Sequence, residues 1–225
     1  MTARVDPRDI SHLVVLGHPS PDSFCHAMAD AYCESVRACG QGAVLRDLYA
    51  MGFDPLLKAT ERPDTPDFAP AADVAAELDL VRASQVVTLV YPIWFGMPPA
   101  IIKGYVDRVL GAGFLARDIK AGKLNPLLHG KRLVILSSSA STMPWLEEQG
   151  QWAALRQAFD TYLTMIFSLK GCDHLHFDAV VDGMTDYRFR ENLGLLDAQA
   201  RKTSSEVLAE IHAAKMRTIR TPHIM

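Results

Sequence analysis

Five short apolar segments, separated by longer amphipathic ones, constrain this chain more than any other feature of its sequence. They predict strands at 12–17, 43–47, 85–91, 133–137 and 174–181. The first of them, HLVVLG, is a nearly unbroken apolar run, as expected for a parallel strand that is covered on both faces.

The segments between these strands predict helices. Apolar residues recur every three or four positions from Ser23 to Cys39, and Gly40 then ends the pattern. Similar patterns predict helices over 71–83, 98–110, 152–169 and 197–217. Strands that alternate with helices at this spacing form right-handed βαβ units. The sequence therefore predicts an α/β fold, a doubly wound five-stranded parallel sheet with helices on both faces, and one domain over residues 1–225.

Composition narrows the class of function. The net charge of −3 over 225 residues argues against nucleic acid and anionic membrane surfaces as partners. The four cysteines form no Cys-x-x-Cys pair, and no histidine lies at zinc-finger spacing from them, so we expect neither a disulfide framework nor a metal site. No apolar run approaches the roughly 18 residues that a membrane span needs, and the first ten residues lack the apolar core of a signal peptide. We expect a cytoplasmic protein that is not inserted in a membrane.

Doubly wound sheets bind ligands beyond the carboxyl ends of their strands. The loop after the first strand, His18 to Phe24, precedes a helix whose free N–H groups favour an anion, and Ser23 and His18 add donors. It would hold a phosphate without Lys or Arg, and it contains neither the dinucleotide nor the nucleoside-triphosphate glycine motif. A serine that caps the helix without any ligand explains this loop equally well.

Two further strand ends carry unusual loops. The segment 91–99 places three aromatic residues among its first five, and three prolines and a glycine stiffen it, which is typical of a loop that covers a flat ring. Packing in a core or an interface is the alternative. The loop 137–142 consists of small residues, mostly hydroxyl-bearing, that let backbone approach a ligand, although alone it is typical of a solvated turn. Three such loops at strand ends favour one shared site.

Three segments resemble the flavodoxin-like NAD(P)H:quinone oxidoreductase family. They are HPSPDSF at 18–24, DLYAMGFDPLL at 47–57 and YPIWFGMPPAIIKGYVDRVLGAGF at 91–114. The resemblance implies a bound FAD, with FMN as the alternative, NADPH or NADH as electron donor, and a quinone or similar small aromatic acceptor. It also implies a homodimer in which residues 111–130 reach the partner, with Phe114 and Leu115 buried there. FAD is favoured because the second segment is similar to the FAD-using members.

The resemblance also implies the cofactor contacts. The first loop would hold the phosphate and ribityl region, the second would run along the isoalloxazine, and the third replaces a Thr-Thr-Gly-Gly loop. The implied cofactor-binding residues are His18, Ser23, Phe24, Cys25, Pro92, Ile93, Trp94, Phe95, Ser138, Ser139, Ala140 and Ser141. Cys25 stands where the family has Asn.

The tyrosine and histidine that assist proton transfer in the family have no counterpart here, so no catalytic residue is assigned. His129, His174 and His176 lie in the corresponding half of the chain, and a histidine near a strand is more often packed or exposed than an acid.

The sequence thus predicts a flavoenzyme that passes hydride from NAD(P)H through the flavin to a quinone-like acceptor, with ping-pong kinetics. Three alternatives stay open. A one-electron flavin carrier has the same fold. A regulatory subunit of a transporter would dock through Lys103, Asp107 and Arg108, although Lys103 and Asp107 at this spacing more commonly form a surface pair. An azo- or nitro-compound reductase differs only in its acceptor.

Overall fold

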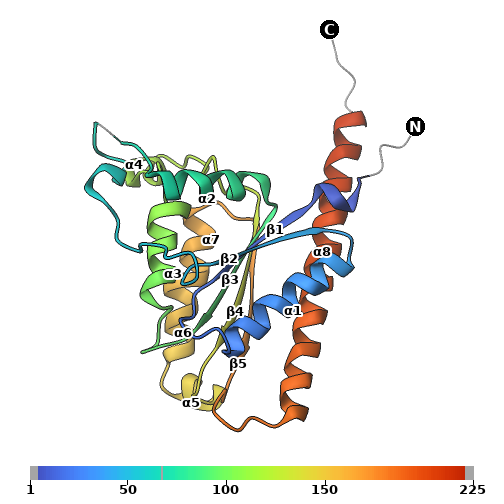
Figure 1. Ribbon diagram of the computed structural model, residues 1–225. Coiled ribbons are helices and arrows are strands. Elements are labelled where there is room, and N and C mark those ends of the chain that lie inside the picture. Colours follow the sequence, from blue (N-terminus) through green and yellow to red (C-terminus); the bar gives the residue numbers. More distant parts are fainter. Residues whose placement is uncertain (1–4, 67, 221–225) are drawn as a thin grey trace.

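The structure is a computed structural model that describes residues 5–66 and 68–220. Its centre is an all-parallel sheet with the strand order β2-β1-β3-β4-β5 (Figure 1). The strands are β1 Ser11–Leu16, β2 Gly42–Asp47, β3 Val86–Pro92, β4 Arg132–Ser138 and β5 Gly171–Phe177. The predicted α/β class and the five-stranded parallel sheet are confirmed.

Helices cover both faces of this sheet (Figure 1). One face carries α1 Phe24–Ala38 and the long α8 Asp186–Arg220, which pack on each other. The other carries α2 Ala72–Ala83, α3 Ala100–Tyr105 with its π-helical extension η3 Val106–Leu110, and the run α6 Gln151–Leu155, η4 Arg156–Thr161 and α7 Tyr162–Ile166. Shorter elements are η1 Pro7–Asp9, η2 Ala59–Glu61, α4 Ala116–Lys120 and α5 Met143–Glu148.

The alternation of side chains along each strand explains why two cores form. In β1, Leu13 and Val15 point into the core under α2 and α3, whereas Val14 and Leu16 point into the core under α1 and α8. All seven residues of β3 are buried, as expected for the central strand. Within the described residues, no helix is long and apolar enough to cross a membrane.

Element boundaries differ from the sequence predictions in the last third of the chain. The predicted strand 174–181 is β5, which begins at Gly171 and ends at Phe177. Ala179 adopts a φ of 48°, so the apolar residues after it cannot continue the strand. The last helix begins at Asp186 rather than at residue 197, because its first turns are polar and contain Gly194, which weakens the periodic pattern.

The structure also corrects the expectation that Arg108 faces a partner protein. Its side chain is buried and makes ion pairs with Glu61 at 2.7 Å and Asp73 at 2.8 Å. The guanidinium also lies 5.2 Å from the centre of the Phe53 ring. Lys103 and Asp107 form the expected surface pair, at 2.6 Å.

Candidate functional site

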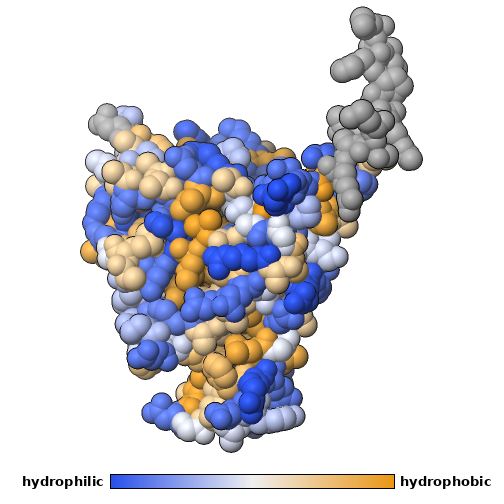
Figure 2. Space-filling model, turned by 45° about the vertical axis from the view of Figure 1, so that its right-hand side comes forward, coloured by the Kyte–Doolittle hydropathy of each residue, from blue (hydrophilic) through white to orange (hydrophobic). Residues whose placement is uncertain are grey.

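The carboxyl ends of the strands lie at the lower end of the molecule in Figure 1, where α1 and α8 begin and α5 lies. At this lower end, Figure 2 shows hydrophobic side chains among hydrophilic ones. A larger hydrophobic band is separate from them and lies higher on the same face. Exposed apolar side chains on the segments after β4 and β5 include Trp145, Val181 and Tyr187. The loops at this end of the sheet are therefore the candidate site.

The first loop ends in a capped helix. Ser23 is the N-cap of α1, and its Oγ accepts a hydrogen bond from the His26 N–H at 3.3 Å. The His26 ring joins Ser23 Oγ, 2.9 Å from its Nδ1, to Asp47 Oδ2, 3.0 Å from its Nε2. No acceptor for the N–H groups of Phe24 and Cys25 is present in the described part of the chain, so both are available to an anion.

The orientation of His18 suits the same anion. Its Nδ1 lies 3.0 Å from the Ser20 nitrogen and 3.2 Å from the Ser20 carbonyl oxygen, so this nitrogen is engaged with Ser20 in either tautomer of the ring. Partial burial lowers the pKa of His18, and its Nε2 has no hydrogen-bond partner among the described residues, which leaves Nε2 for a ligand. Its ring centre lies 5.6 Å from that of Trp94, which joins the first loop to the second.

The second loop closes in a tight turn with an aromatic tip. Trp94 and Met97 exchange two backbone hydrogen bonds, each 3.1 Å long. The two residues between them adopt left-handed backbone, with φ of 48° at Phe95 and 79° at Gly96. This conformation is strained for a bulky residue, and the Phe95 side chain is fully exposed at the tip. Such strain in an exposed aromatic residue is typical of a ligand-binding loop.

The third loop is attached to both of the others. Ser138 O accepts a hydrogen bond from the Ile93 N–H at 2.7 Å, and Ser138 Oγ lies 3.5 Å from Cys25 Sγ. Burial raises the pKa of the Cys25 thiol to about 11, so it is a neutral contact and not a nucleophile. The structure therefore brings all three loops, with the twelve predicted residues, to one end of the sheet. Whether these residues bind a cofactor stays a prediction.

A fourth loop, after β5, was missed by the sequence analysis. It is tied to the third loop, because the Val180 N–H donates to Ser139 O at 2.8 Å. The Phe24 ring packs edge-on against Phe177 and Phe189, at 5.5 and 5.9 Å between ring centres. The first and fourth loops together enclose a hollow of about 500 Å³. Its apolar lining includes Phe24, Val180, Val181, Met184 and Phe189.

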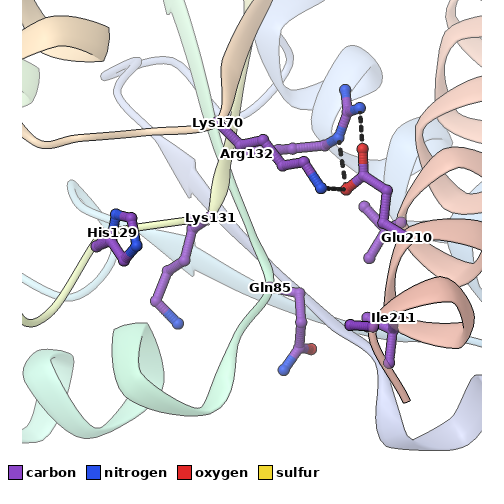
Figure 3. Close-up of a pocket in the computed structure, with 10 residues that line it drawn as sticks. Gln85, His129, Lys131, Arg132, Lys170, Glu210 and Ile211 are labelled. Carbon is purple, nitrogen blue, oxygen red and sulfur yellow. Dashed lines mark hydrogen bonds and ion pairs between the residues drawn. The ribbon is translucent and has the colours of Figure 1, made fainter. Parts of the chain in front are cut away.

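A second hollow lies near the amino ends of β3 and β4, at the other end of the sheet (Figure 3). The cations there are already paired, because Glu210 binds Arg132 at 2.6 Å and Lys170 at 2.8 Å. Lys131 donates to the carbonyl oxygens of Arg82 and Ser84. We therefore place the functional site at the carboxyl end.

The donor set at the carboxyl end fits a flavin. Unpaired N–H groups at the start of α1, with Nε2 of His18 in the same loop, suit a phosphate. The strained aromatic turn and the small residues of the third loop suit a flat ring with a polar edge. Of the described residues, no three His, Cys, Asp or Glu side chains gather as a metal site would require.

Comparisons with known proteins identify the family of the chain. The family described as flavodoxin-like fold matches residues 11–202. An uncharacterized NAD(P)H oxidoreductase of Haemophilus influenzae is 30% identical over 208 residues, which are 92% of this chain and 96% of that protein. NAD(P)H dehydrogenase [quinone] 1 of Rattus norvegicus is 32% identical over 57% of this chain, and that match spans 53% of the rat protein.

Solved structures give the same fold. The NAD(P)H:quinone oxidoreductase from Methanothermobacter marburgensis superposes with a TM-score of 0.72 at 22% identity and covers 87% of this chain and 96% of its own. An FMN-dependent NADH-azoreductase from Bacillus anthracis, in complex with FMN, gives 0.62 at 13% identity over 87% of this chain and 99% of its own. With a family match over most of its length and a relative of this extent, the chain belongs to the flavodoxin-like fold family.

Proposed function

We propose that this protein is a flavin-dependent oxidoreductase that takes hydride from NADPH or NADH and passes it to a quinone or a similar small aromatic acceptor. The convergence of the three loops carries the proposal, because it sets phosphate donors beside a strained aromatic turn. The names of the relatives, NAD(P)H oxidoreductase and NAD(P)H dehydrogenase [quinone], support the same reaction class.

Each loop has one task in this reaction. The flavin, when bound, supplies the hydride chemistry, so the protein needs few titrating groups of its own. The Phe24 and Cys25 N–H groups and His18 Nε2 would hold the phosphate. Trp94 and Phe95 would pack beside the ring, and the loop Ser138 to Ser141 would line its polar edge and exclude water.

We propose FAD as the cofactor, because the hollow beside the first loop has room and apolar lining for a second nucleotide moiety. Val180, Met184 and Phe189 line this hollow and would contact such a moiety. FMN is the alternative, and the azoreductase that binds FMN has the same fold.

The direct test is the identity of the cofactor. The purified protein should be yellow, and heat should release a flavin that chromatography identifies as FAD. NADPH should then reduce a simple quinone without any other protein, with parallel lines in steady-state plots. A protein that stays colourless when FAD or FMN is added contradicts the proposal.

The same assay separates the alternatives. A one-electron carrier would bind flavin yet not oxidise NADPH with a quinone. Faster turnover with an azo or nitro compound than with quinones would favour the alternative of an azo- or nitro-compound reductase. Of the three residues considered for docking on a transporter, Arg108 is buried, whereas Lys103 and Asp107 form an exposed pair. Pull-down from cell extract separates this alternative from a free enzyme.

We also propose a homodimer. An apolar groove lies between η3 and α7, lined by Leu57, Val106, Phe159, Tyr162 and Ile166 among others. Phe114, expected to be buried by the partner, is already partly buried against the protein's own core. The groove therefore offers a second copy an apolar surface in addition to the segment 111–130, where Ile119 and Leu124 are exposed.

A further inference from the structure

Beneath the third loop lies a chain of hydrogen bonds that the reaction described above does not use. Asp160 Oδ2 is 2.7 Å from His174 Nδ1, and His174 Nε2 is 2.6 Å from Ser137 Oγ. Ser137 Oγ is 2.8 Å from His176 Nδ1, and His176 Nε2 is 3.1 Å from Ser139 Oγ. The Ser139 hydroxyl also donates to Ser141 O at 2.9 Å. The chain therefore joins a carboxylate in η4 to the loop proposed to line the flavin.

The strand geometry explains why these groups meet. His174 and His176 are two residues apart on β5, so their side chains lie on the same face of the sheet. Ser137 is the register partner of His176 on β4, and Ser139 follows two residues later. Helix segment η4 packs over this face and brings Asp160 to the first histidine.

The chain is shielded from water. The side chain of His174 is fully buried, Asp160 is 3% exposed, and Trp152 covers both imidazoles at 4.8 and 5.2 Å between ring centres. Asp160 Oδ1 is buried with no hydrogen-bond partner within the described structure. A buried carboxylate in this position is stabilised by a positive charge beside it, and Arg156, at 3.4 Å, is half exposed. His174 is the buried group that can supply the charge.

Counting protons shows that the chain has two states. If both rings are neutral, His174 keeps its proton on Nδ1 for Asp160, and Ser137 donates to His174. His176 then donates from Nδ1 to Ser137, and the one proton of Ser139 must serve both His176 Nε2 and Ser141 O. If His174 carries a second proton, every bond reverses between it and Ser139, and each acceptor in the chain receives its own donor. The doubly protonated state is therefore the one in which the geometry is fully satisfied.

We propose that Asp160, His174, Ser137 and His176 form a proton relay that ends at the Ser139 hydroxyl, on the loop that faces the bound ligand. The Nε2 proton of His174 passes to Ser137 Oγ, the Ser137 proton passes to His176 Nδ1, and the His176 Nε2 proton passes to Ser139 Oγ. The Ser139 proton leaves to an anion at the loop. One proton is delivered, and His174 becomes neutral. The proposed function enters only in naming the recipient, since reduction of a quinone by hydride also requires a proton.

The charged surroundings agree with this direction. Asp160 faces His174 from η4, Arg156 lies 3.4 Å from Asp160, and Cys172 on β5 and Tyr91 on β3 also lie near Asp160. Burial and the neighbouring His174 lower the pKa of His176 to about 4, against a smaller opposite effect of Asp178. His176 therefore stays neutral and changes only which nitrogen holds its proton.

This gives the relay a signature that no merely structural role would produce. The test uses the full-length protein labelled with ¹⁵N on histidine, with and without flavin, and follows the imidazole nitrogens by NMR as the pH rises. When His174 loses its proton, the His176 proton should move from Nε2 to Nδ1 at the same pH, without His176 becoming charged. A His176 tautomer that stays the same throughout overturns the relay.

Ser137→Ala breaks the chain in the middle. In this variant the His176 tautomer should no longer depend on the protonation of His174. Ser84→Ala is the matched control, because Ser84 is another buried serine, and its hydroxyl donates to Val81 O at 3.0 Å, outside the relay. This variant should keep the coupled change of the His176 tautomer. A switch that persists in Ser137→Ala overturns the relay.

A second measurement tests delivery of the proton. In stopped-flow experiments, Ser137→Ala should slow oxidation of the reduced protein by a quinone at least about tenfold, with flavin binding unchanged. An unchanged rate overturns delivery. If the protein binds no flavin, the proposed function fails while the tautomer switch can still be seen, so the two failures are distinguishable.

Discussion

At the scale of single residues, Arg108 shows how a polar group can hold a core together. It is buried between Glu61 and Asp73, and the ion pair with Arg108 lowers the pKa of Glu61. We predict that Arg108→Met lowers the free energy of unfolding at pH 7 by about 3–5 kcal/mol, because Glu61 is left charged and buried. Lys103→Met removes a surface ion pair instead and should change the free energy of unfolding by less than about 1 kcal/mol.

The pH dependence of the stability that this ion pair provides follows from the direction of the Glu61 pKa shift. A lowered pKa in the folded state means that the stabilisation is present above the ordinary Glu pKa of 4.5 and is lost as the pH falls through the folded value. The difference between Arg108→Met and the unmodified protein should therefore shrink between pH 7 and pH 3. Urea unfolding at both pH values measures it, and a difference that does not depend on pH contradicts the assignment to Glu61.

Gly17 sets how closely α3 approaches the end of β1. A Cβ atom there would lie 2.5 Å from Cγ1 of the fully buried Ile102. We predict that Gly17→Ala destabilises the fold by about 1–3 kcal/mol through overpacking. Gly171→Ala, where a Cβ atom meets nothing within 4 Å, serves as the control. Equal urea midpoints for the two variants would contradict this account.

The residues that sequence reasoning found share one property: they lie at the carboxyl ends of strands or in the segments that follow, where the fold rule places ligands. Those it missed depend on contacts between distant segments. Ser137 and His174 are 37 positions apart, and only the register of β4 and β5 brings them together. The pattern Asp-His-Leu-His-Phe at 173–177, beside Ser137 and Ser139, was the available signal, because alternate residues of a strand share a face.

At the scale of elements, the turn 94–97 holds an exposed aromatic residue in a strained backbone conformation, which lowers the stability of the fold. Phe95 has a φ of 48°, which costs a bulky residue about 1–2 kcal/mol relative to a residue that tolerates left-handed backbone. Phe95→Asn should therefore raise the urea midpoint while it weakens flavin retention. Phe95→Val should lower both the urea midpoint and flavin retention, because valine is β-branched and tolerates left-handed backbone poorly. A loss of stability in the Asn variant would contradict the strain argument.

The central elements were predicted well and the last ones poorly, for a physical reason. The strands β1, β3 and β4 are covered on both faces, so their apolar runs mark them clearly. The edge strand β5 is mostly half-buried, and the apolar Val180 and Val181 beyond it line a hollow instead of extending it. The start of α8 has too few apolar residues for its period to be visible.

At the scale of the whole molecule, the apolar groove between η3 and α7 is the surface that we propose for association of two copies. Beside it on α7, Tyr162 is 51% exposed and Met165 67%. We predict a dimer by sedimentation at micromolar concentration and a melting temperature that rises with protein concentration. Tyr162→Lys should give a monomer, whereas Tyr187→Lys, an exposed aromatic residue on α8, should remain a dimer. A monomeric unmodified protein removes the homodimer.

The hollow beside the first loop draws its walls from opposite ends of the sequence. The proposed phosphate donors come from residues 18–25, and Phe177 and Phe189, which support Phe24, come from the last quarter of the chain. During synthesis on the ribosome, this hollow therefore cannot be complete until α8 has emerged. We consequently expect the proposed cofactor to be loaded late in biogenesis, and a nascent chain arrested after β4 to emerge without it.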